Sequence, residues 1–248
     1  GLGFDTSNYA PELSLALGTP SITPLQLATG YALLANGGYR VEPHLIQRVE
    51  NLEGEVAFEA RPLTVCPDCD LLDMPQGPDG EMTMEAIMAA ENSEAPQFPP
   101  APRVQDARVN YVIDSILKDV IKRGTGRRAL VLERSDIAGK TGTTNGPMDV
   151  WFSGYNQAVV TTVWVGFDNY TPLGRKEFGG TAALPIWIQY MRTALKDSPQ
   201  VERPVPPGIV TVKIDPDNGL LAAPGQRNAI FEYFLQGSVP QQTGRGQS

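Results

Sequence analysis

Apolar residues recur at helical spacing in the middle of the chain. Between positions 109 and 121 they stand one, three or four residues apart: Val109, Val112, Ile113, Ile116, Leu117, Val120 and Ile121. This period predicts an amphipathic helix, and Gly124 and Gly126 mark its end. The apolar stripe is expected to face the core.

A second helix is predicted near the start of the chain, ending near Asn36. Thr23 suits the N-cap, Pro24 the first helical position, and Gln26 can close a capping box with Thr23. The two glycines after Asn36 supply a left-handed cap. A charged hairpin is expected to follow, with strands over 45–50 and 56–58.

Three apolar stretches joined by short turns predict consecutive strands at 137–143, 150–155 and 159–167. Short connections make neighbouring strands antiparallel, so the three form a meander. A helix predicted over 181–195, with Pro185 in its first turns, is expected to lie across this sheet. The predicted fold class is therefore α+β, an antiparallel sheet flanked by helices.

Composition changes at two places along the chain. Residues 61–103 are rich in Pro, Asp, Glu and Met without sustained periodicity, which indicates an insert or loop. After 198 the chain becomes extended and Pro-rich, with a short strand at 211–214 and an end that looks loosely held. We therefore predict a main domain over 1–198 and a C-terminal segment over 199–248.

The net charge and the single histidine limit the classes of function that this chain can have. Twenty Lys and Arg against 28 Asp and Glu give a net charge of -8, which argues against nucleic acid as a partner. His44 is the one histidine, so a His-rich metal site is excluded and a Ser-His-Asp triad would have to use it. No metal or cofactor is predicted.

The first residues carry neither an initiator Met nor a signal-like region, so the chain is expected to be a fragment. No apolar run reaches the roughly 20 residues of a membrane-spanning helix. Any membrane anchor is expected to lie elsewhere.

One predicted strand carries chemistry, in the run Lys140-Thr141-Gly142-Thr143. The strand period of two pairs Thr141 with Thr143 and Lys140 with Gly142, so one short edge presents two hydroxyls, an ammonium and a bare backbone position. Hydroxyls and ammonium can bind a carboxylate, and Gly142 lets a peptide approach closely and pair as an added strand. The set suits a peptide that ends in a free carboxylate.

Lys140-Thr141-Gly142 matches the third motif of penicillin-binding proteins and serine β-lactamases, whose other motifs are Ser-x-x-Lys and Ser-x-Asn. Most of the chain outside the insert and the last few residues resembles the bifunctional class A penicillin-binding proteins. Six blocks carry this resemblance: 15–19, 23–26, 36–39, 140–145, 149–155 and 163–168. The chain looks like the C-terminal part of their transpeptidase domain, so the resemblance implies the penicillin-binding protein and serine β-lactamase-like fold.

The resemblance implies a serine acyl transfer on D-alanyl-D-alanine stem peptides of peptidoglycan, inhibited by β-lactams. Lys140 would support charge and proton relay, Thr141, Gly142 and Thr143 would bind substrate, and the Thr143 N–H would be an oxyanion-hole donor. It also implies a glycosyltransferase domain and a membrane anchor upstream, with the catalytic domain in the periplasm. The upstream part of the protein is then the partner that carries Ser-x-x-Lys and Ser-x-Asn.

The nucleophile of the family is absent from this chain by the same comparison. Ser115 and Lys118 do satisfy Ser-x-x-Lys, but they fall opposite the apolar stripe of their helix and are expected to be a solvated face. Residues 6–8 offer only a loose Thr-x-Asn in the wrong order. Two other functions stay open: a non-catalytic interaction module with the same fold, and a serine β-lactamase.

Two further motifs are weaker. Cys66 and Cys69 have the spacing of half a zinc site, yet a structural zinc needs four ligands, so a local disulfide, a free pair or a site shared with another chain stay open. Residues 215–219 resemble a calcium loop, but Gln226 stands where a Glu is required, so we predict a turn.

Overall fold

A computed structural model describes residues 20–66 and 98–244, together with Ser7, Tyr9, Glu12, Leu13, Leu15 and Gly18. The chain divides into two compact units, over 1–105 and 106–248. Cys69 and most of the predicted insert lie outside the described residues. In the part that is described, no helix is both long and apolar enough to cross a membrane.

The first unit contains helix α1 (Pro24–Ala35) and the hairpin of β1 (Arg48–Glu50) and β2 (Val56–Glu59). The predicted capping box is confirmed, because the N–H of Gln26 donates to Thr23 Oγ1 at 3.2 Å and the N–H of Thr23 donates to Gln26 Oε1 at 2.8 Å. The cap after Asn36 is also as predicted, with positive φ at both glycines. The first strand of the hairpin is shorter than predicted.

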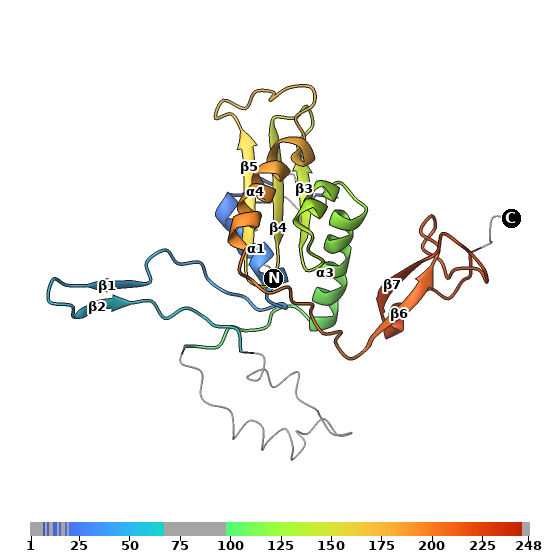
Figure 1. Ribbon diagram of the computed structural model, residues 1–248, viewed down its shortest axis with the longest axis horizontal. Coiled ribbons are helices and arrows are strands. Elements are labelled where there is room, and N and C mark those ends of the chain that lie inside the picture. The colour runs from blue at the N-terminus through green and yellow to red at the C-terminus, as the bar shows by residue number, and fades with distance from the viewer. Residues whose placement is uncertain are drawn as a thin grey trace, which may run out of the picture. The chain divides into compact units, whose positions relative to one another are not determined.

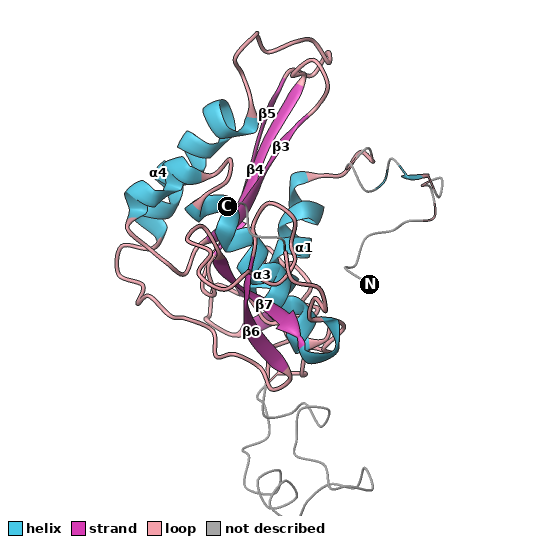
Figure 2. Cartoon of the chain, turned by 90° about the vertical axis from the view of Figure 1, so that its right-hand side faces the viewer, coloured by secondary structure: helices cyan, strands magenta, loops and turns pink. Residues whose placement is uncertain are grey.

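The second unit is built on the predicted meander of β3 (Ala138–Thr143), β4 (Asp149–Tyr155) and β5 (Val160–Gly166). Both pairings are antiparallel. Helix α3 (Ala107–Lys122) lies beside β3, and helix α4 (Leu184–Ala194) packs on β4 and β5 (Figure 1). Figure 2 shows α4 on one face of this sheet. The predicted α+β class and the predicted strand order are confirmed.

Trp187 on α4 is the centre of the core in this unit. Its side chain is fully buried, it meets the Phe152 ring edge-on at 5.0 Å between centroids, and its Nε1 donates to the carbonyl of Thr161 at 3.2 Å. Beneath it lies Gly154, whose missing Cβ would stand 2.7 Å from the indole ring. An aromatic side chain of this size stabilises the unit mainly by the apolar area that it removes from water.

Helix α3 buries a face that coincides only partly with the predicted one, because Ile121 of the apolar stripe is buried. Val109 and Ile116 of the apolar stripe are exposed, whereas Asn110 and Asp114 are buried. Lys118 is also largely covered, with 13% of its side chain exposed. The prediction that Lys118 points away from the core is therefore wrong.

The polar face of α3 can be buried because its charges are paired. Lys118 Nζ lies 3.2 Å from Asp114 Oδ2 and 3.0 Å from Glu202 Oε2, and the Tyr155 hydroxyl donates to Asp114 Oδ1 at 2.9 Å. Burial of a charge is costly unless such partners are present. Hydrophobic periodicity alone does not detect Glu202 and Tyr155, which lie far from α3 in the sequence.

The C-terminal segment is not loosely held over its described part. Strand β6 (Ile209–Ile214) pairs with β7 (Ile230–Leu235), which the sequence analysis missed. The Tyr233 ring packs on Tyr111 of α3 with centroids 5.1 Å apart. The prediction was wrong because β7 was not read as a strand, although β-branched and aromatic residues make up most of it. Residues 215–219 form the predicted turn, with Gly219 at positive φ.

Gly154→Ala is expected to destabilise the second unit by about 2 kcal/mol, because overpacking a full core forces the backbone or a side chain to shift. The added methyl would lie 2.7 Å from the Trp187 ring and 2.8 Å from the carbonyl oxygen of Ala138. Urea unfolding followed by tryptophan fluorescence measures the loss. Gly237→Ala is the matched control, because nothing lies within 4 Å of its Cβ position. Equal stability of both variants would contradict the packing described.

Asp136 should make stability depend on acid. Burial would raise the pKa of this carboxyl, but hydrogen bonds from Arg134, Asn156 and the N–H of Val201 outweigh burial and hold the pKa below its ordinary 3.8. A lowered folded-state pKa stabilises the protein above the unfolded-state pKa, and this contribution is lost as pH falls from about 3.8 through the folded value. The unfolding free energy of the wild type should therefore decline over that window.

Asp136→Asn should remove this part of the acid dependence and cost roughly 3 kcal/mol at pH 7, because Arg134 would be left buried without its carboxylate. Chemical denaturation at a series of pH values measures both effects. The exposed Asp217→Asn is the control. An unchanged pH profile in Asp136→Asn would show that the ion pair does not act as described.

Candidate functional site

The exposed end of β3 carries the predicted site residues. The strand begins buried at Ala138 and becomes accessible from Lys140 to its end. Thr141 is paired with Phe152 and Thr143 with Val150, so both hydroxyl-bearing residues project to the face on which α4 packs. Among the described strands β3 pairs with β4 only, so it is an edge of the sheet.

The Thr143 hydroxyl is held by a backbone donor from a distant turn. The N–H of Gly179 donates to Thr143 Oγ1 at 3.0 Å. Gly179 opens a π-helical turn, Gly179–Ala183, that leads into α4. A Cβ at Gly179 would lie 2.4 Å from the carbonyl oxygen of Trp151 and 2.6 Å from that of Gly142, so this approach is open only to glycine. Because its oxygen accepts from Gly179, the Thr143 hydroxyl keeps its own proton for a ligand.

The Thr141 hydroxyl has two polar neighbours. Its Oγ1 lies 2.7 Å from Oγ1 of Thr125, which stands in the turn after α3. Lys140 Nζ donates to the carbonyl of Thr141 at 2.8 Å and lies 3.5 Å from its Oγ1. The side chain of Lys140 therefore bends across the edge of the strand. Its ammonium lies near the Thr141 hydroxyl, although the two side chains leave the strand on opposite faces.

Gly142, which has no side chain, packs closely against Trp151 of the neighbouring strand β4. A Cβ there would approach the Cβ of Trp151 to 3.1 Å. Glycine at this position therefore also serves strand packing. Close approach of a substrate to Gly142 stays a prediction.

Sequence reasoning missed Gly179 and Thr125. Neither lies near the Lys-Thr-Gly motif in the sequence, and only the fold brings them to the strand. The one local signal is glycine: Gly179-Gly180 and Gly124-Thr125-Gly126 both place glycine where tight backbone packing occurs.

Together these residues form a donor-rich strand end. Two hydroxyls and an ammonium lie within one short stretch of β3. Such a group is chemically able to bind an anion such as a carboxylate. In the described part of the chain, no three His, Cys, Asp or Glu side chains are grouped as metal ligands.

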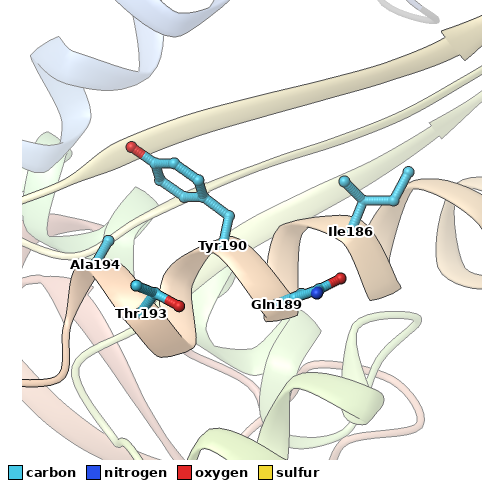
Figure 3. A pocket seen from close by; sticks show the side chains of 5 residues that line it. All are labelled: Ile186, Gln189, Tyr190, Thr193 and Ala194. Atoms are coloured by element: carbon cyan, nitrogen blue, oxygen red, sulfur yellow. The ribbon is translucent and has the colours of Figure 1, made fainter.

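One hollow in the described part of the chain lies away from this site. It lies on the outward face of α4, has a volume of about 580 Å³, and is lined by Ile186, Gln189, Tyr190, Thr193 and Ala194 (Figure 3). Its lining is mainly apolar and includes no residue of the site strand. The residues that line this hollow therefore supply neither a nucleophile nor an acid–base pair to the Lys-Thr-Gly end of β3.

Lys118 does not suit the part of a general base for Ser115. Burial would lower the pKa of its ammonium, but the nearby charges of Asp114 and Glu202 outweigh burial and raise the pKa. A lysine that is held protonated in two ion pairs cannot take a proton from a serine. This is a different reason from the predicted solvent exposure, and it leads to the same rejection of Ser115.

Cys66 is disulfide-bonded, so it is not a free thiol or a zinc ligand. Its neighbour at two residues' distance, Cys69, lies outside the described residues.

Two family models match the chain. The penicillin-binding protein transpeptidase domain matches residues 5–191, and the C-terminal domain of penicillin-binding protein 1A matches residues 205–244. Penicillin-binding protein 1A of Pseudomonas aeruginosa is 48% identical over 96% of the chain and 30% of its own length. That of Escherichia coli K12 is 37% identical over 97% of the chain and 33% of its own length.

Among solved structures, penicillin-binding protein 1A from Haemophilus influenzae matches 98% of the chain and 36% of its own chain, with a TM-score of 0.80 and 36% identity. The chain thus spans about a third of the length of these relatives. The site strand, the meander and both family models agree: the chain belongs to the penicillin-binding protein transpeptidase family.

Proposed function

We propose that this chain supplies the carboxylate-binding half of a D,D-transpeptidase site that cross-links stem peptides of peptidoglycan. The observation that carries the proposal is the strand end on which Lys140, Thr141 and Thr143 present three donors. In this proposal the Thr141 and Thr143 hydroxyls hold the terminal carboxylate of D-alanyl-D-alanine. Penicillins, which carry a similar carboxylate, would occupy the same position.

The reaction is an acyl transfer in two steps. A serine oxygen attacks the carbonyl of the penultimate D-alanine, the peptide bond breaks, and the terminal D-alanine leaves with a proton on its nitrogen. An amine of a second stem peptide then attacks the ester and releases the serine. The N–H of Thr143 is proposed as an oxyanion donor, a kind of group worth about 3 kcal/mol in related enzymes.

The serine and its lysine are proposed to lie in an upstream part of the same protein. Two facts support this: the relatives are about three times as long as this chain, and the described part of the chain offers no other pair of motifs to complete Lys-Thr-Gly than the rejected Ser115 and Lys118. We further propose that the full protein is a bifunctional glycosyltransferase and transpeptidase, anchored in the inner membrane with this domain in the periplasm. The division into a domain over 1–198 and a segment over 199–248 belongs to the same proposal.

The two alternative functions, a serine β-lactamase and a non-catalytic module, would each react with penicillin differently from a transpeptidase. A serine β-lactamase would release the hydrolysed product quickly, and a non-catalytic module would not be acylated. The intact donor set on β3 favours the transpeptidase over a module that keeps only the fold.

Thr143→Val and Lys140→Met, made in the full-length protein, test the proposal. Loss of a hydrogen bond to a charged group should slow acylation by a fluorescent penicillin roughly tenfold to a hundredfold in each variant. Gel fluorescence over time measures the rate. The exposed Thr193→Val and Lys213→Met are matched controls and should label as the wild type does. A wild type that stays unlabelled, or variants that label at the wild-type rate, would contradict the proposal.

A further inference from the structure

The turn after α3 is fixed by tight glycine contacts. The N–H of Gly124 donates to the carbonyl of Asp119 at 3.0 Å, and that of Gly126 donates to the carbonyl of Val120 at 2.9 Å. A Cβ at Gly124 would lie 2.8 Å from Val120 Cα, and one at Gly126 would lie 2.8 Å from Ile121 Cδ1. Thr125, between these glycines, is thus carried by a backbone that has little freedom to shift.

Thr125 meets the site from two directions. Its hydroxyl oxygen lies 2.7 Å from that of Thr141, and its carbonyl oxygen lies 3.1 Å from the Cβ position of Gly180. Gly180 follows Gly179, the donor to Thr143. Two turns from distant parts of the chain therefore close on the same strand end, and each gives one of its hydroxyls a polar partner.

The chemistry of a hydroxyl shows what this partner can do. A threonine hydroxyl has one proton to donate and two lone pairs to accept with. A carboxylate only accepts, so a bound carboxylate needs the Thr141 proton to point toward it. If the Thr125 hydroxyl donates to Thr141 Oγ1, the Thr141 proton is left for the ligand, and its donor strength rises because linked hydrogen bonds polarise one another.

We propose that Thr125 is a positioning residue of the transpeptidase site, which orients the Thr141 hydroxyl for the substrate carboxylate. The inference rests on the proposed function and adds a residue outside the Lys-Thr-Gly motif. Thr125 acts through Thr141 and does not itself contact the substrate. Its counterpart at Thr143 is the backbone N–H of Gly179, which only a substitution by proline would remove.

The test uses the full-length protein and penicillin, with Thr125→Val and Thr125→Ser. Valine keeps the β-branched shape but removes the hydroxyl, so we expect about a tenfold weaker non-covalent complex before acylation. Stopped-flow labelling at a series of penicillin concentrations separates this dissociation constant from the acylation rate constant. Thr125→Ser should restore the wild-type dissociation constant, which a purely structural role of the threonine methyl would not explain. A loss that falls only on the acylation rate constant would overturn the proposal.

A double-mutant cycle with Thr141→Val decides whether Thr125 acts through Thr141. If it does, Thr125→Val adds nothing once the Thr141 hydroxyl is gone, so the double variant binds as Thr141→Val does. Additive losses would mean that Thr125 acts independently, and the proposal would be wrong. The thermal midpoint of each variant shows whether it is folded, and Thr193→Val is the control for an exposed threonine elsewhere in the unit.

The outcomes separate the two proposals. If the wild-type protein is not acylated, the proposed function fails. If the wild type and Thr125→Val are acylated with equal constants, the proposed function stands and only the role of Thr125 fails.

Discussion

The packing of Trp187 on the bare backbone of Gly154 is the contact on which the second unit depends. This contact holds α4 so close to the meander that there is no room for a Cβ at Gly154. The π-helical turn at Gly179–Ala183 runs directly into α4, so the seating of α4 also sets the position of Gly179. The apolar contact in the core therefore also fixes the position of the Gly179 N–H, which donates to Thr143 Oγ1 at the surface.

The hydroxyls of the candidate site are therefore oriented by contacts within the protein. Each of its two hydroxyls already has a partner, Gly179 for Thr143 and Thr125 for Thr141. Both partners lie in turns where glycine permits an approach that no other residue allows. Binding groups that are held in place by packed neighbours lose little entropy when the ligand binds, which favours both affinity and catalysis.

Local signals in the sequence were sufficient for much of the fold. The capping box of α1 and the meander follow from residues that are close together in the chain, and the structure confirms both. The buried face of α3 was predicted only in part, and the strand β7 was not predicted. In α3, pairs such as Lys118 with Glu202 join residues far apart in the sequence, and a periodicity of apolar residues cannot register a charge that is buried with its partner. Gly179 and Thr125 were missed at the site for the same reason, since they reach β3 only through the tertiary fold.

We propose that this chain holds half of a penicillin-reactive site and that the nucleophile lies elsewhere in the protein. Labelling of the isolated chain and of the full-length protein with a fluorescent penicillin, followed by peptide mapping of the adduct, tests it most directly. We expect that only the full-length protein is labelled, on a serine of an upstream Ser-x-x-Lys. An adduct on Ser115, or a full-length protein that takes no label, would contradict it.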